Sequence, residues 1–243
     1  MIERPKVVVT MPRYGDVSMG AARGFCAPST TRNVPPEAHV DVVAWCETST
    51  SATPSSFNNL LAMALGYRDD GIATHFAMIH SDIDPHGAWV NVLWNEMRRH
   101  DAAVMTTVIP IKNMQGKTST AVGSLDDPWR IRRYIMQADR AHLPDTFGQA
   151  DVCGDDEVLL VNTGLWLADL RHAFWDSFSF RWFNRILKKE DGTRECQFRP
   201  EDWEMSRELH AAGLKTMATW LLPVTHHGAY GYENATITPE TQS

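Results

Sequence analysis

Short apolar runs alternate with stretches of helical spacing along the first 110 residues. The runs are rich in Val, Ile, Phe and Ala and end at Pro or at polar residues, as buried strands do. They cover residues 6–11, 40–45, 74–79 and 103–109. Between them, apolar residues recur every three or four positions from Phe57 to Leu65 and from Trp89 to Met97, as on one face of a helix. This β-α-β alternation predicts an α/β fold with a mostly parallel central sheet and helices on both faces.

Two predicted helices have recognisable ends. Ser55 or Ser56 is expected to cap the first of them, because a serine hydroxyl can accept a hydrogen bond from the free N–H groups of a helix start. Pro200, Glu201 and Asp202 predict the start of the second, where proline fits and acidic side chains are favourable. The buried face and the end of this second helix are marked by Met205, Leu209, Ala212 and Gly213.

The pattern weakens after Pro110, so residues 111–154 are interpreted as an irregular insertion with a few short elements. Strands are predicted again at 158–161 and 215–222. We expect one domain over residues 1–243, because this length suits a single α/β core. It divides into a nucleotide-binding half (1–110), an acceptor-side half (111–231) and a loosely ordered tail (232–243).

Composition narrows the class of protein. A hydrophobic content of 43% with 22% charged residues is ordinary for a globular domain, and the net charge of −7 argues against a surface that binds polyanions throughout, although a local basic groove stays open. The four cysteines are widely spaced, which suggests neither a zinc cluster nor a disulfide framework. No apolar signal core and no run of about 20 apolar residues is present. These features predict a soluble cytoplasmic protein.

The most informative motif is the pair Asp82 and Asp84, which directly follows the apolar run at 74–79. The carboxyl ends of parallel strands form the ligand side of an α/β sheet, and carboxylate oxygens suit a divalent cation that carries phosphate. The alternative is that Asp82 merely caps a turn before Pro85. His80, inside the strand end, is expected to be structural.

Other polar residues follow predicted strands at the same edge. Asn162 and Gly164 lie in a turn after residues 158–161, where glycine lets a ligand approach the backbone. Arg13 and Glu47 follow the first two strands, at positions suited to a nucleotide base and ribose, although Arg13 could equally be a solvated charge.

Taken together, these motifs resemble GT-A fold glycosyltransferases, particularly the family 2-like enzymes of phage and bacterial type that use nucleotide-sugar donors. The resemblance spans most of the chain and depends on the order and spacing of its motifs. They are residues 7–12 as the first nucleotide-binding strand, His80 to Asp84 as the Asp-x-Asp motif, Asn162 to Trp166 as the glycine-containing loop, Pro200 to Trp203 as the acidic motif, and the late pair His226 and His227.

The resemblance implies a divalent cation, Mn²⁺ or Mg²⁺, bound together with a nucleotide-diphosphate sugar. Asp84 would be its direct ligand, and Asp82 would contact the donor or reach the metal through water. His226 or His227 would supply a further ligand, and we prefer His226 because it comes first after the strand. The donor nucleotide would be held by Pro12, Arg13, Glu47, Asp82, Asp84, Asn162 and Gly164.

The resemblance also implies a catalytic base that takes the proton of the acceptor hydroxyl. Asp202 matches this base, and Glu201 is the alternative, since adjacent helix positions point in different directions and only one can face the sugar. Without the other motifs, both acids would be interpreted as ordinary stabilisers of a helix start.

Several basic and aromatic residues have weaker interpretations. Lys112, Lys117 and residues 130–133 could meet pyrophosphate or an anionic acceptor, but runs of charge are more often solvated surfaces. Trp166 and Trp203 could stack on a sugar ring or belong to the core.

The predicted function is a metal-dependent glycosyltransferase with a hydroxyl acceptor, and the resemblance implies that it inverts the anomeric configuration. The acceptor stays open among small molecules, glycans, proteins and hydroxymethylated DNA bases, the last with a groove formed by basic segments between Arg130 and Arg199. The alternatives are a metal-dependent phosphohydrolase or nuclease, and an inactive module that binds nucleotide sugars.

Overall fold

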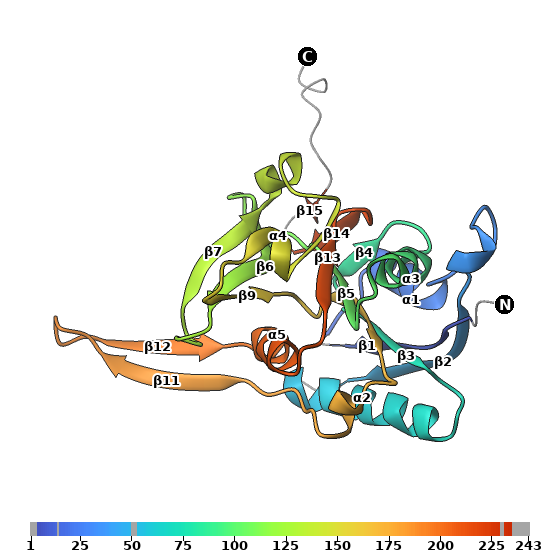
Figure 1. The fold of residues 1–243 in the computed structure, drawn as a ribbon, viewed down its shortest axis with the longest axis horizontal. Coiled ribbons are helices and arrows are strands. Elements are labelled where there is room, and N and C mark those ends of the chain that lie inside the picture. The colour runs from blue at the N-terminus through green and yellow to red at the C-terminus, as the bar shows by residue number, and fades with distance from the viewer. Residues whose placement is uncertain (1–3, 14, 50–52, 229–230, 235–243) are drawn as a thin grey trace, which may run out of the picture.

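A seven-stranded mixed sheet forms the centre of the molecule (Figure 1). This computed structural model describes residues 4–13, 15–49, 53–228 and 231–234. In spatial order the central strands are β2 (Asp41–Thr48), β1 (Lys6–Pro12), β3 (His75–Ile79), β10 (Leu165–Asp169), β5 (Val104–Thr107), β13 (Thr216–Thr219) and β8 (Thr146–Gly148). Five strands share one direction, whereas β10 and β8 run against them. The α/β class is therefore confirmed, with a more mixed sheet than the sequence predicts.

Helices cover both faces of this sheet, as predicted. Successive residues of a strand point to opposite faces, so Val8 packs with α2 (Thr53–Asp69) and α5 (Glu201–Ala211), whereas Val9 packs with α3 (Trp89–His100). The shorter α1 (Met19–Cys26) lies beside β4 (Ile83–Pro85). Each face thus buries its own apolar cluster, and the chain forms two layers of core around one sheet.

The predicted helix ends are partly right. The helix α2 begins at Thr53, so Ser55 and Ser56 lie inside its first turn and the predicted cap is wrong. Pro54 explains the earlier start, because a proline needs no N–H partner in the first turn of a helix. At the other helix, α5 starts at Glu201 as expected, and Gly213 follows its end with a φ of +68°.

The interpretation of residues 111–154 as irregular is wrong. Strands β6 (Lys117–Ser124) and β7 (Ile131–Met136) pair with β9 (Glu157–Leu160) in a separate three-stranded sheet, followed in the chain by the short helices η2 (Gln137–Ala141) and α4 (Gln149–Val152). The strand predicted at 158–161 therefore exists but lies outside the central sheet. The sequence pattern did not predict β6, because this strand is rich in Thr and Ser. Thr118 is nevertheless buried, and its hydroxyl donates to the carbonyl of Ile135 at 2.6 Å.

A second small sheet has three strands as well. It contains β4, β14 (Val224–His227) and β15 (Gly231–Glu233). Asn234 is buried behind it, and its side-chain amide donates to the carbonyls of Val108 and Leu222. The predicted tail therefore starts too early, since residues 232–234 are part of the fold, and residues 235–243 lie outside the described part of the chain.

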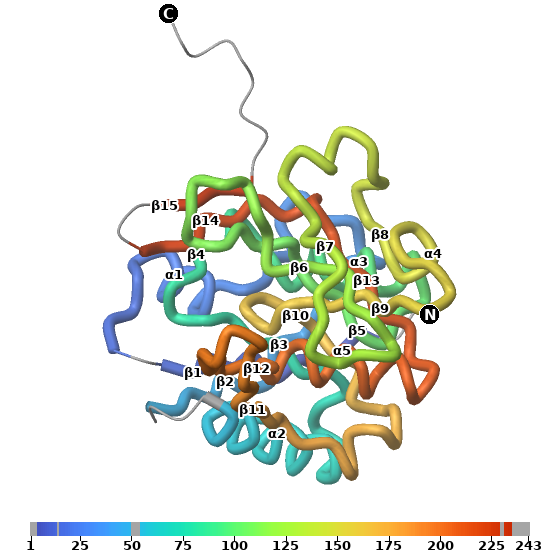
Figure 2. Tube along the Cα trace, turned by 90° about the vertical axis from the view of Figure 1, so that its left-hand side faces the viewer, coloured from blue at the N-terminus to red at the C-terminus, as the bar shows by residue number. Residues whose placement is uncertain are grey.

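A two-stranded hairpin of β11 (Phe183–Lys188) and β12 (Arg194–Arg199) extends away from the rest of the molecule (Figures 1 and 2). The apolar pattern predicts no regular element over residues 183–199. Two further short helices are η1 (Pro36–Ala38) and η3 (Ala173–Asp176). Within the described ranges, no helix combines the length and the apolar character needed to cross a bilayer.

Candidate functional site

The strands place the predicted site residues at one edge of the central sheet. β1, β3 and β5 end at this edge, and the antiparallel β10 begins there. The segments that follow β3 and precede β10 therefore meet, although more than 80 positions separate them in the sequence. A backbone hydrogen bond of 2.8 Å from His80 N–H to the Gly164 carbonyl joins them directly.

A cavity of about 190 Å³ lies at this meeting point. It is the place where four of the five predicted motifs come together, because the Asp-x-Asp segment, the glycine turn, the acidic helix start and the late histidines all contribute to its walls or border it. Its lining includes His80, Ser119, Asn162, Gly164, Asp202 and His226.

The turn between β9 and β10 is held in one conformation by its own side chains. The amide oxygen of Asn162 accepts from Gly164 N–H at 3.0 Å, and the amide nitrogen donates to the Thr107 carbonyl at 2.7 Å. A Cβ on Gly164 would lie 2.8 Å from Cδ1 of Ile109, so a larger residue would require that side chain to shift. The predicted role of Gly164, to let a ligand approach the backbone, stays a prediction.

Asp82 lies in the turn before β4 and is surrounded by cationic or polar donors. Lys112 Nζ is 2.5 Å and His226 Nε2 is 3.3 Å from Asp82 Oδ2. Burial alone would raise the pKa of Asp82, but the hydrogen bonds from His226 and Lys112 outweigh it and hold this pKa well below its usual range. Asp82 is therefore a permanent anion.

The tautomer of His226 follows from its second contact. Nδ1 lies 2.8 Å from the carbonyl oxygen of Pro110, which can only accept, so Nδ1 carries a proton. Nε2 consequently faces Asp82 either as a donor or with its lone pair directed at a shared cation. A histidine that binds a metal through one nitrogen commonly donates from the other to a carbonyl in this way.

Asp84 points to a different neighbourhood. It is contacted by Arg23 at 3.4 Å and by His227 at 3.9 Å, and it packs so closely on α1 that a Cβ at Gly20 would lie 1.9 Å from its carboxyl carbon. Neither Asp84 nor Asp82 lines the cavity, but Asp82 contacts His226, which does. This contact favours Asp82 as a metal ligand, and the predicted preference for Asp84 stays a prediction.

The four predicted metal ligands form two pairs, Asp82 with His226 and Asp84 with His227. Across the described part of the chain, no group of three or more His, Cys, Asp and Glu side chains is arranged to hold a metal ion. The pair Asp82 and His226 fits a divalent cation as a carboxylate and a correctly oriented imidazole, provided that Lys112 moves aside and the remaining ligands come from a bound molecule.

Glu201 and Asp202 form the opposite wall of the cavity, at the start of α5. Burial and the neighbouring Glu201 raise the pKa of Asp202 well above its ordinary value, and burial also raises that of Glu201. The Asp202 carboxylate accepts from Trp203 N–H at 2.8 Å, and its carbonyl accepts from the Ser206 hydroxyl at 2.8 Å. Asp202 is thus fixed in place and has a high affinity for a proton.

His80 is kept neutral by its surroundings. Loss of hydration lowers its pKa to about 4, and its ring lies 5.2 Å from that of Phe57. This agrees with the structural role expected for His80.

Three predicted nucleotide contacts lie farther along the same edge. Arg13 N–H donates to the Thr48 carbonyl at 2.8 Å, and Glu47 is aligned with Met11 in the parallel pair of β1 and β2. Pro12 is buried at the end of β1, whereas Glu47 is exposed. None of the three lines the cavity, so their predicted role stays a prediction.

The structure separates the weaker candidates. Trp166 is fully buried in the core and cannot stack on a sugar. Trp203 packs against the apolar cluster formed by β6 and β9. Arg132 pairs with Asp156 at 2.6 Å and Arg133 donates to the Val152 carbonyl, so both serve the fold. By contrast, Lys112 directly contacts Asp82, although its position in the sequence indicated an ordinary solvated charge. Its charge and its position after a strand were the only signals available for it.

Comparisons with known proteins bear on the fold alone. No model of a known protein family matches this chain, and no curated protein matches it either. Solved structures do resemble it, among them the crystal structure of A197 from STIV, with a TM-score of 0.50 and 13% sequence identity over 92% of this chain and 86% of that chain. The fold and the cavity thus define an α/β protein with a polar site at the carboxyl edge of its mixed sheet.

Proposed function

We propose that this protein is a metal-dependent glycosyltransferase that moves a sugar from a nucleotide-diphosphate donor to a hydroxyl acceptor. The observation that supports the proposal is a pair of carboxylates with opposite proton affinities, of which Asp202 lines the cavity and Asp82 contacts the lining residue His226. Asp82 stays ionised beside His226 and Lys112, whereas Asp202 binds a proton readily. Glycosyl transfer needs both properties, because a diphosphate has to be neutralised while a hydroxyl loses its proton.

The cation would be held by Asp82 and His226, and when bound it would neutralise the negative charge that develops on the departing diphosphate. Lys112 supplies a second positive charge at the same place. Because its ammonium lies 2.5 Å from Asp82, it can exchange that carboxylate for a phosphate oxygen as the donor binds. Asn162 and Gly164 fix the floor on which the donor sugar would lie.

Asp202 acts on the acceptor. The acceptor oxygen forms a bond to the anomeric carbon, the bond from that carbon to the diphosphate oxygen breaks, and the diphosphate leaves with the electron pair. The hydroxyl proton passes to the Asp202 carboxylate, whose raised pKa favours this transfer. Glu201, next to Asp202 and also at the cavity, acts indirectly by raising that pKa.

The test is a panel of nucleotide sugars incubated with Mn²⁺ or Mg²⁺ and scored by release of nucleoside diphosphate, with and without a chelator. We expect release from one class of donor, loss of release on chelation, and a fall of about 100-fold or more in Asp82→Asn. The matched control is Asp156→Asn, which breaks a comparable ion pair to Arg132 away from the cavity.

Two outcomes contradict the proposal. One is metal-dependent cleavage of phosphate esters with no preference for sugar nucleotides, which would select a phosphohydrolase. The other is full activity of Asp82→Asn.

A further inference from the structure

The hairpin of β11 and β12, here called the arm, has two different faces. Paired residues of antiparallel strands share a face, and successive residues alternate. The inner face carries Phe183, Arg185 and Arg199, and the last two stack on Trp129 at 4.6 and 5.2 Å. The inner face therefore attaches the base of the arm to the body of the protein.

The outer face is apolar along most of its length. Trp182, Ile186 and Phe198 are 45%, 67% and 49% exposed, and the rings of Trp182 and Phe198 meet edge to face at 6.0 Å. Ile186 is paired with Cys196, so the apolar surface continues across both strands. Exposed apolar patches commonly mark binding surfaces, and a hairpin of two strands is only marginally stable in water. Both facts favour a binding role for this face of the arm.

The free end of the outer face carries two positive charges. Lys188 lies directly opposite Arg194, and within the described residues neither side chain pairs with an acid. Like charges in facing positions destabilise a hairpin. Lys189, on the adjacent position, is different because it pairs with Glu195 at 2.8 Å. Lys188 and Arg194 together thus offer a site for one anionic group.

The arm also contrasts in charge with the rest of the chain. Residues 183–199 contain five basic and three acidic residues, a net charge of +2, so the other residues carry −9 of the total of −7. The arm is therefore more favourable to an anionic molecule than the rest of the chain is.

The arm leads directly to the proposed base. β12 ends at Arg199, which pairs with Glu204 at 2.9 Å, and Asp202 follows in the first turn of α5. The six residues from Arg194 to Arg199 make five steps along the strand and span about 17 Å. A chain bound along the outer face would have its anionic group at the tip and one end near Asp202.

Resting on the proposed function, we propose that the arm binds the acceptor, and that this acceptor is a glycan chain carrying carboxylate or phosphate groups. Aromatic side chains suit sugar rings, and the single cation pair suits a polymer with sparse charge. A nucleic acid presents a phosphate at every nucleotide and would need cations along its whole path, which the acidic body does not supply.

The experiment measures binding without donor or turnover, by titration calorimetry, and uses hexagalacturonate as the probe. Maltohexaose tests the need for charge, digalacturonate tests the need for length, and oligothymidylate tests the nucleic-acid alternative. We expect hexagalacturonate to bind more tightly than all three. The variant Lys188→Glu/Arg194→Glu should weaken its binding by about tenfold, and Ile186→Ser/Phe198→Ser should weaken it too.

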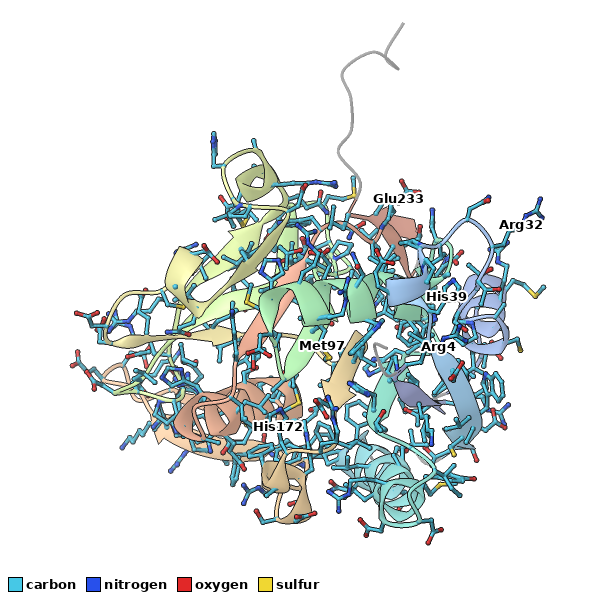
Figure 3. The ribbon with its side chains drawn as sticks, turned by 45° about the vertical axis from the view of Figure 1, so that its right-hand side comes forward. Arg4, Arg32, His39, Met97, His172 and Glu233 are labelled. Atoms are coloured by element: carbon cyan, nitrogen blue, oxygen red, sulfur yellow. The ribbon has the colours of Figure 1, made fainter. Side chains whose placement is uncertain are left out.

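The matched control is Arg4→Glu/Arg32→Glu, which reverses two basic residues far from the arm (Figure 3). It should bind hexagalacturonate as the unmodified protein does. Release of nucleoside diphosphate to water, in the absence of any acceptor, should be unchanged in both arm variants. If that release is absent from the unmodified protein, the proposed function fails, whereas the binding result stands by itself.

The proposal is overturned by any of three results. These are no binding of hexagalacturonate, equal weakening by the control variant, or tighter binding of oligothymidylate that the arm variants abolish.

Discussion

Asp202, which lines the cavity, and Asp82, which contacts the lining residue His226, have opposite environments. Asp82 lies at the corner of β4 and β14, where Lys112 and His226 donate to it and hold its pKa low. Asp202 lies at the start of α5, where burial and Glu201 raise its pKa. Both residues are aspartates, so the difference between their pKa values comes entirely from their surroundings.

This contrast underlies the proposed roles. An ionised carboxylate next to cationic side chains can exchange partners with a charged ligand, whereas a carboxylate of high proton affinity can accept a proton from a hydroxyl. When two environments separate the pKa values of two acids, the acid and base functions are separated with them. Three substitutions at the site should have effects of decreasing size if the two functions are separated in this way.

The largest effect is expected from Asp202→Asn. The amide cannot accept the acceptor proton, so the rate of sugar transfer should fall by about 100- to 10,000-fold. Donor binding, measured by titration calorimetry, should change little because the donor is held by the opposite wall. Loss of donor binding together with transfer would show that Asp202 belongs to the donor site and would end the proposed division.

A smaller effect is expected from Lys112→Met. Removing the ammonium leaves Asp82 without its nearest positive partner, so a divalent cation no longer has to displace it. The affinity for Mn²⁺ should rise by about tenfold, since each 1.4 kcal/mol changes a binding constant by that factor. Lys117→Met is the control, because Lys117 lies over the ring of Tyr134 at 5.3 Å. An unchanged Mn²⁺ affinity would show that the cation does not bind at Asp82.

The smallest effect is expected from Glu201→Gln. The charge of Glu201 raises the pKa of Asp202, so its removal should lower that pKa. A base works only when deprotonated, and kcat/KM therefore falls as the pH drops through its pKa. The acidic limb of the pH profile should move to lower pH in Glu201→Gln and stay in place in Glu208→Gln, which alters the outer side of the same helix. A limb that moves to higher pH would contradict the role of Asp202.

The quality of the sequence-based prediction differs along the chain for a physical reason. In the first 110 residues, β1, β2, β3, β5, α2 and α3 were predicted, because each buries a continuous apolar run or face, whereas the short elements α1, η1 and β4 were not predicted. β6 was missed since its buried threonines satisfy their hydroxyls locally, as Thr118 does. β10 was missed although it lies at the centre of the sheet, because Asn162 to Trp166 was interpreted as one loop.

The candidate site shows the same division. The residue types of Asp82, Asp202 and His226 were recognised from their motifs, and all three border or line one cavity. The pairing of Asp82 with Lys112 and the packing of Asp84 against α1 could not be predicted, since both depend on contacts between segments far apart in the sequence. The arm was equally hard to predict, because charged and polar residues interrupt the apolar positions along both of its strands.

The sequence by itself determined the α/β class, the approximate positions of the parallel central strands and of α2, α3 and α5, and the chemical types available to the site. Local apolar periodicity and helix-end preferences contain that information. Only the tertiary structure decided which carboxylate is ionised, which histidine faces it and which strand lies at the centre of the sheet. Those properties depend on burial and on Coulomb interactions between groups brought together by the fold, and such interactions act through space rather than along the chain.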